Sequence, residues 1–261
     1  MELLIIPLVI LALIHFFSRL FVRKGWTVNN YTGLKTPYSI GTVLFAVVTL
    51  DALFYRMFPV GPWEYYYLSF VWILGLIDDR FGKPQPKGIR GHFRLFLEKK
   101  EVSTGLIKAV GVAAAATIYM LFSFEGGMYF GLAALMLLIL FPHSMNLFDT
   151  KPLRVWKILS LLIFWPVFTN AGLITAACLA LVIIMLGSAE SRIQGMLGDN
   201  GAMLAGALGA ILLLHYAGSL YILAVTVFTV IVTFLAERIS LQAWVEATPG
   251  IKLLDQFGRL K

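Results

Sequence analysis

Charged residues and cysteine are scarce in this sequence. Only 13% of its 261 residues are charged and 59% are apolar, with a mean hydropathy of +0.85, whereas soluble globular proteins carry roughly 25% charged residues. The single cysteine, Cys178, lies within an apolar run, which excludes a disulfide framework and a cysteine-based metal site. His15, His143 and His215 also lie in apolar runs, without acidic neighbours at ligand spacing, so packing roles are expected for them.

Long apolar runs make up most of the chain. They predict an all-α, polytopic integral membrane bundle that forms one membrane-embedded domain over residues 1–261. The first run lacks a basic leading segment and a small-residue cleavage site, so a retained helix is expected rather than a signal peptide. Nine runs reach or nearly reach the length needed to cross a bilayer about 30 Å thick, at residues 3–22, 41–58, 64–78, 105–123, 127–147, 156–169, 172–188, 202–216 and 219–236.

Lysine and arginine gather in alternate loops between these runs. With nine spans, 20 of the 21 basic residues lie in or beside the loops on one side, and only Arg56 falls on the other. The positive-inside rule makes the basic side cytoplasmic, with the N-terminus outside and the C-terminus in the cytoplasm. This placement, together with anionic lipid headgroups, accounts for the net charge of +7 without a nucleic-acid partner.

The predicted topology brings four aspartates to one membrane face. Asp78 and Asp79 end the third span. Asp149 ends the fifth span and Asp199 precedes the eighth. Asn146 lies one helical turn before Asp149, on the same face. Carboxylates at helix ends suit Mg²⁺, which prefers oxygen ligands and usually takes one or two carboxylates plus substrate phosphates. The pattern therefore predicts metal-dependent phosphate chemistry at the cytoplasmic face.

Each of these motifs also has a purely structural explanation. The pair Asp78-Asp79 could be a solvated helix end neutralised by Arg80. Asp149 could cap the helix that follows it, and Asp199-Asn200 could supply the N-cap of the eighth span. A capped helix N-terminus also presents its positive end to a phosphate, so capping and anion binding are compatible there.

The loop 80–104 is the largest basic patch, with seven lysine and arginine residues. Arg90, His92 and Arg94 are its candidate substrate contacts, and the two arginines are four residues apart, on one face if the segment is helical. Topology and adhesion to anionic lipid would explain the patch. A substrate carrying a diphosphate would need the same positive charge.

Four stretches in this order form a recognisable set: Asn30–Pro37 (NYTGLKTP), Gly75–Gly82 (GLIDDRFG), Asn146–Asp149 (NLFD) and Gly198–Gly201 (GDNG). They resemble signatures of the polytopic polyprenyl-phosphate sugar-1-phosphate transferases. That family includes the phospho-N-acetylmuramoyl-pentapeptide transferases and the polyprenyl-phosphate GlcNAc-1-phosphate transferases. The similarity extends from about residue 25 to residue 240. Each motif alone is weak, but four in register on one face are specific.

The resemblance implies a Mg²⁺-dependent reaction in cell-envelope glycan assembly, at the cytoplasmic face of a bacterial membrane. A UDP-sugar would pass its sugar-1-phosphate to a polyprenyl phosphate and release UMP. Asp78 and Asp79 would orient or deprotonate the lipid phosphate, and Asn146 and Asp149 would position the nucleotide. The implied catalytic residues are Asp78, Asp79 and Asp149, the metal ligands Asp199 and Asp79, and the substrate-binding residues Asn146, Arg90, His92, Arg94, Lys35 and Asn200.

The chain also departs from the family pattern. Pro152 stands where the third motif usually has a second aspartate, and a histidine-rich loop and a tenth span are missing. The sequence therefore resembles a short, divergent branch whose sugar specificity does not transfer. A non-catalytic relative that binds the lipid carrier or regulates an envelope partner stays open, as does a homodimer. A transporter of a lipid-linked glycan would need several charges inside spans, and Asp51, which could pair with Arg56, is nearly alone.

Overall fold

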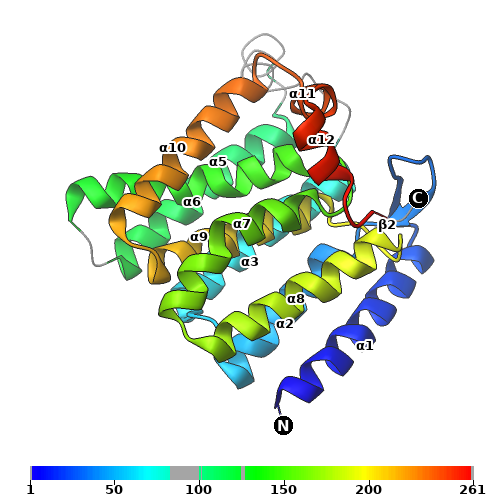
Figure 1. The fold of residues 1–261 in the computed structure, drawn as a ribbon, viewed down its shortest axis with the longest axis horizontal. Helices are drawn as coiled ribbons and strands as arrows, with labels where there is room; N and C mark the ends of the chain where they lie inside the picture. The colour runs from blue at the N-terminus through cyan, green and yellow to red at the C-terminus, as the bar shows by residue number, and fades with distance from the viewer. Residues whose placement is uncertain (1, 83–99, 101, 125–126, 260–261) are drawn as a thin grey trace.

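The computed structural model describes residues 2–82, 100, 102–124 and 127–259. It confirms the all-α prediction, since long helices form the body and the one sheet in the described part is a two-stranded ribbon (Figure 1). The strands β1 (Thr27–Asn29) and β2 (Lys35–Pro37) are antiparallel, with Thr27 opposite Pro37. The helices are α1 (Glu2–Arg23), α2 (Ile40–Leu50) with the π-helical turn η1 (Asp51–Tyr55), α3 (Pro62–Phe81), α5 (Thr104–Ser123), α6 (Met128–Phe148), α7 (Arg154–Asn170), α8 (Leu173–Ser191), α9 (Gly198–Tyr216), α10 (Ser219–Ala236), α11 (Leu241–Ala247) and α12 (Pro249–Gln256).

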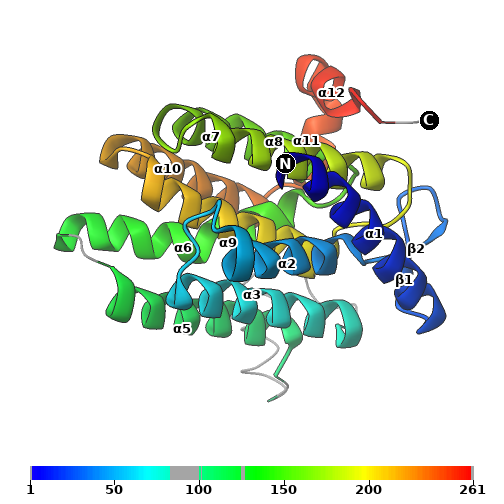
Figure 2. The same cartoon turned by 90° about the horizontal axis from the view of Figure 1, so that it is seen from below.

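Helix α9 lies at the centre of the bundle and is packed by α2, α3, α6 and α7 (Figure 2). Its residues 201–213 are all buried. Glycines allow the neighbouring backbones to approach closely. A Cβ atom on Gly41 of α2 would lie 2.3 Å from the Gly201 Cα, and one on Gly75 of α3 would lie 2.5 Å from the Asn200 Cα. Small residues at such contacts are typical of helix packing in membranes.

Five of the described helices are long and apolar enough to cross a membrane: α1, α5, α6, α8 and α10. The segment Ile40–Tyr55 is a shorter apolar helix. Of the remaining long helices, α7 has 17 residues, whereas α3 carries charges at both ends and α9 begins with polar residues. These five helices support a multi-pass membrane protein. The nine crossings and their orientation remain predictions.

The two ends of the bundle differ in composition. We call the end where α3 finishes and α9 begins the site end, and the opposite end the far end. At the far end, Glu64 accepts hydrogen bonds from the Tyr119 hydroxyl (3.2 Å) and the Ser123 hydroxyl (3.1 Å). The His215 Nε2 lies 3.7 Å from the same Glu64 oxygen. His215, for which a packing role is expected from the sequence, thus lies beside an acid that is distant along the chain, because α9 ends beside the start of α3.

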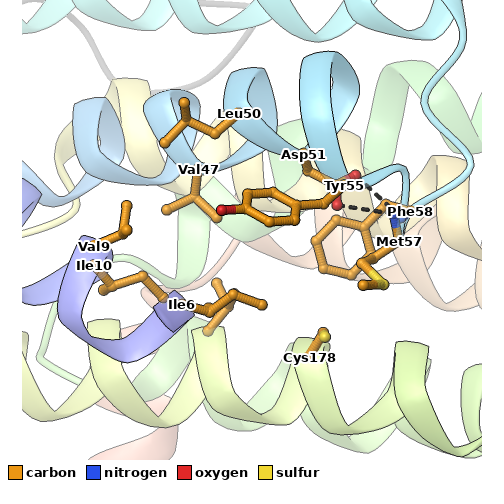
Figure 3. A pocket seen from close by; sticks show the side chains of 11 residues that line it. Ile6, Val9, Ile10, Val47, Leu50, Asp51, Tyr55, Met57, Phe58 and Cys178 are labelled. Atoms are coloured by element: carbon orange, nitrogen blue, oxygen red, sulfur yellow. Dashed lines mark hydrogen bonds between the residues drawn. The ribbon is translucent and has the colours of Figure 1, made fainter. Parts of the chain in front are cut away.

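A small apolar pocket at the far end lies between α1, α2 and α8, with Asp51 at its edge (Figure 3). The Asp51 carboxylate accepts the amide N–H groups of Met57 (2.9 Å) and Phe58 (3.1 Å). These bonds close the turn after η1, where Arg56 has a left-handed φ of 51°. Two backbone amides, rather than the expected Arg56, thus satisfy the Asp51 carboxylate.

The C-terminal residues form two short helices, α11 and α12, at the site end. This agrees with the sequence, which predicts no tenth span here. Helix α12 is attached to the start of α7 through charged groups. Arg154 donates two hydrogen bonds to the Asp255 carboxylate, both 2.9 Å long, and Arg259 contacts the same carboxylate. The Lys157 ammonium donates to three backbone carbonyls at the end of α12, at 2.7–2.8 Å. This group of contacts fixes which face of α12 points toward the bundle.

We predict that this attachment weakens in acid. Burial raises the pKa of Asp255, but hydrogen bonds from Arg154 and Arg259 outweigh burial and lower the pKa to about 2. Because the folded-state pKa lies below the unfolded value, the pair contributes stability above pH 3.8 that is lost as the pH falls toward 2. Thermal unfolding in detergent should show a stability difference between wild type and Asp255→Asn that shrinks over this range. Glu246→Gln, which changes an exposed ion pair with Lys151, should have little effect at any pH. A difference that persists unchanged in acid would contradict the prediction.

Candidate functional site

Three carboxylates from two helices meet at the site end. Asp78 and Asp79 come from the last turn of α3, and Asp199 comes from the first turn of α9. The Lys108 ammonium of α5 contacts the carboxylates of both Asp78 and Asp199. Sequence analysis did not single out Lys108, because it is one basic residue inside an apolar run and its partners are far away along the chain.

Asp79 holds the N-terminus of α9. Its two oxygens accept the backbone N–H groups of Asp199 and Asn200, each at 2.9 Å, and the Asn200 side-chain amide donates to the same carboxylate at 2.6 Å. The first amides of a helix have no partner within the helix, and here a carboxylate from α3 supplies it. Gly198 begins α9 with a φ of +65°, and a Cβ there would lie 2.9 Å from an Asp79 oxygen. The capping group is therefore Asp79, rather than Asp199 or Asn200 as the structural alternative supposed.

The first motif joins the site through its C-terminal end. The Asn200 side-chain amide donates to the Tyr38 carbonyl at 3.2 Å. The Met196 amide donates to the Pro37 carbonyl at 2.9 Å. These bonds attach the residues that follow β2 to the loop that precedes α9. Lys35 is exposed at the start of β2.

Asn146 also reaches the aspartate cluster. Its side-chain amide lies 3.4 Å from an Asp199 oxygen, and its own Oδ1 is buried with no hydrogen-bond partner in the described part of the chain. Asp149 is the C-cap of α6. Burial, followed by the charges of Glu190, Asp199 and Asp79, raises the pKa of Asp149 well above its ordinary value. Asp149 therefore lies within electrostatic range of the cluster.

Glu190 braces two of the motif-bearing loops and was missed in the sequence. This buried carboxylate at the end of α8 accepts the Leu153 amide at 3.0 Å and the Leu197 amide at 3.4 Å. Leu153 is the N-cap of α7 and provides no side-chain cap. Glu190, rather than Asp149, thus accepts the hydrogen bond of the Leu153 amide. The sequence signal was an acid directly after an apolar run, next to Ser191 and Arg192.

The cluster carries more negative than positive charge. Its three carboxylates face one ammonium group, that of Lys108, which contacts two of them. A bound proton or cation would offset the remaining repulsion between the carboxylates.

Oxygen atoms suited to Mg²⁺ lie at this point. The Asp78 and Asp199 carboxylates share the Lys108 ammonium, and Asn146, whose Oδ1 has no partner among the described residues, lies beside Asp199. In the described residues no three histidine, cysteine, aspartate or glutamate side chains form a metal-holding group. Sites with one or two carboxylates are nevertheless usual for Mg²⁺ when substrate phosphates and water complete the shell. The donor set therefore fits the ion, which would share both carboxylates with Lys108.

The remaining predicted substrate contacts, Arg90, His92 and Arg94, fall within residues 83–99 and lie outside the described residues. The Asp79 carboxylate is already an acceptor for three donors. Its assignment as a second metal ligand stays a prediction, as does the Mg²⁺ role of Asp199.

We predict that Asp79 is needed for stability as well as for any chemistry. Asp79→Ala should lower the free energy of unfolding by about 1–3 kcal/mol, because the Asp199 and Asn200 amides lose their acceptor in a buried place. Denaturant or thermal unfolding of the purified protein in detergent measures this change. Glu246→Ala removes an exposed carboxylate and serves as the control. Equal stability of the two variants would show that α9 does not depend on Asp79.

No family model, curated protein or solved structure matches this chain. The resemblance to the sugar-1-phosphate transferases therefore depends on the four motifs, and their functional interpretation is developed from the site itself.

Proposed function

We propose that this protein transfers a sugar-1-phosphate from a UDP-sugar to a polyprenyl phosphate and releases UMP. One observation carries the proposal. Motifs that are far apart in the sequence join in one contact network. Asp199 contacts Asn146 and Asp79 across 53 and 120 residues, and Lys108 contacts both Asp78 and Asp199. Asn200 reaches Tyr38 across 162 residues. If the motifs were chance matches to short sequence patterns, they would not be expected to lie together in the folded chain.

The proposed chemistry joins two anionic reactants. An oxygen of the lipid phosphate forms a bond to the sugar-bearing phosphorus of the donor, and the bond from that phosphorus to the UMP oxygen breaks. Positively charged groups must stabilise the negative charge that develops on these oxygens in the transition state. Lys108 supplies an ammonium group at this point. Bound Mg²⁺ would supply further neutralisation.

The aspartates have separable roles in this proposal. Asp199 and Asp78 hold Lys108 and are the expected Mg²⁺ and lipid-phosphate residues. Asp79 fixes the N-terminus of α9 and thereby aims Asp199. Asn146, in the last turn of α6, and Asp149, the C-cap of that helix, would position the nucleotide.

We further propose that the nine helices α1, α2, α3 and α5 to α10 cross a bacterial cytoplasmic membrane with the site end inside. In the topology predicted from the sequence, 20 of the 21 basic residues lie in or beside the loops on the cytoplasmic side, which supports this orientation. Lipid-linked acceptor and soluble donor would then meet at the cytoplasmic surface.

Two other functions compete with the transferase. A transporter of a lipid-linked glycan would need a polar path between the two ends. In the described residues the face that α3 buries between Glu64 and the site end consists of Tyr67, Leu68, Val71, Leu74 and Gly75, with no charge, which disfavours such a path. A non-catalytic relative would keep the lipid-binding site without turnover, and the assay below distinguishes it.

Purified full-length protein should release UMP when given polyprenyl phosphate, Mg²⁺ and the correct member of a panel of UDP-sugars. UMP release should stop with EDTA and in Asp199→Asn, whereas the remote variant Glu246→Gln should keep wild-type turnover. Absence of UMP with every donor, together with intact binding of polyprenyl phosphate, would contradict the transferase and favour the non-catalytic relative.

Lys108 offers a sharper test, because only the tertiary structure points to it. Lys108→Met should reduce kcat by about 10²–10³-fold, the range seen when one charge-stabilising group is removed from an active site. Lys24→Met, which changes an exposed lysine just after α1, is the matched control. Turnover of Lys108→Met near the wild-type value would remove Lys108 from the mechanism.

A further inference from the structure

Helix α12 exposes an unusual amount of apolar surface for a short helix outside the bundle. Leu253, Leu254 and Phe257 are 72%, 70% and 79% exposed. The helix lies on the outer side of the α7–α8 layer, at the site end (Figure 2). If water surrounded this helix, three large apolar side chains within five residues would be exposed to the solvent.

The attachment of α12 determines which residues are left outside. Successive helical residues are about 100° apart, so Leu253, Leu254 and Phe257 share an arc of about 100°. Asp255 lies on the opposite side and is buried against Arg154 and Arg259. Lys252 and Gln256 form a third, exposed polar face. The ion pairs prevent the helix from rotating to hide its apolar face.

The apolar face continues onto the side of the bundle. A lateral groove of about 740 Å³ runs between α7 and α8 and ends at Phe257 and Gly258. Its walls include Leu161 and Ile184, which are 78% and 66% exposed. Because α8 is long and apolar enough to cross a membrane, this exposed apolar side is expected to face lipid acyl chains. The apolar face of α12 lies at the end of the same surface.

We propose that α12 is a membrane-interface helix, which inserts Leu253, Leu254 and Phe257 into the leaflet at the site end. Lys252, which is exposed on the polar face of α12, suits the phosphates of anionic lipids. Interfacial helices place an apolar face at the acyl boundary and a basic polar face toward water. The buried face of α12 holds the start of α7. Lipid contact and the position of the loop that follows Asp149 are therefore mechanically connected.

Site-specific fluorescence in the full-length protein tests the proposal. The natural cysteine is first removed by Cys178→Ala. An environment-sensitive thiol fluorophore is then attached to a cysteine introduced by Leu254→Cys on the apolar face. The matched control carries the fluorophore on the polar face of the same helix, through Gln256→Cys. Both proteins are reconstituted in nanodiscs of zwitterionic and anionic phospholipid. Quenching by nitroxide lipids labelled near the headgroup is compared with quenching by aqueous iodide.

The label at position 254 should be quenched severalfold more strongly by the nitroxide lipid than the label at 256, and iodide should give the reverse order. Equal quenching by iodide at both positions would overturn the proposal. Protection of position 254 from both quenchers would also overturn it, and would indicate that a second copy of the chain covers the face. Phe257→Cys repeats the comparison independently if Leu254→Cys does not fold. None of these outcomes depends on sugar-phosphate transfer.

Discussion

The hydrogen bonds between the Asp79 carboxylate and the first amides of α9 are the contact on which the site depends. They join the end of one helix to the beginning of another across 120 residues of sequence. The amides of a helix N-terminus are strong donors without internal partners, and leaving them buried and unpaired would be costly. The hydrogen bonds from these amides to Asp79 fix the first turn of α9, and with it the position of Asp199. Asp78, next to Asp79 in the last turn of α3, lies in the same region. Lys108 then offsets the repulsion between Asp78 and Asp199.

Close packing around α9 makes this contact possible. Gly41, Gly75 and Gly201 let the backbones of α2 and α3 lie against α9 at distances that a Cβ atom would block. Because these are backbone contacts, they leave little freedom for the helices to slide or rotate. The packing of the apolar helices thus determines where the polar groups at the site end lie. At the far end, the polar contacts around Glu64 form a separate cluster.

The loops between helices are held by groups outside the motifs. Glu190 accepts amides from both the α6–α7 and the α8–α9 connections, and α12 holds the start of α7 through Asp255. The loop after Asp149 is therefore braced by α12, through the contacts of Asp255 with Arg154 and Arg259.

Much of the architecture could be predicted from sequence alone. The lengths of the apolar runs located the helices closely, as at 105–123 for α5 and 219–236 for α10. Whether a run is long and apolar enough to form such a helix depends on its own residues and not on distant parts of the chain. Alternation of chain direction also brought Asp78, Asp79 and Asp199 to one end. The contacts of Lys108, Glu190 and His215, and the capping role of Asp79, could not be predicted. Each depends on how a helix is rotated about its axis and which neighbour it meets, and these are decided by packing among residues far apart in the sequence.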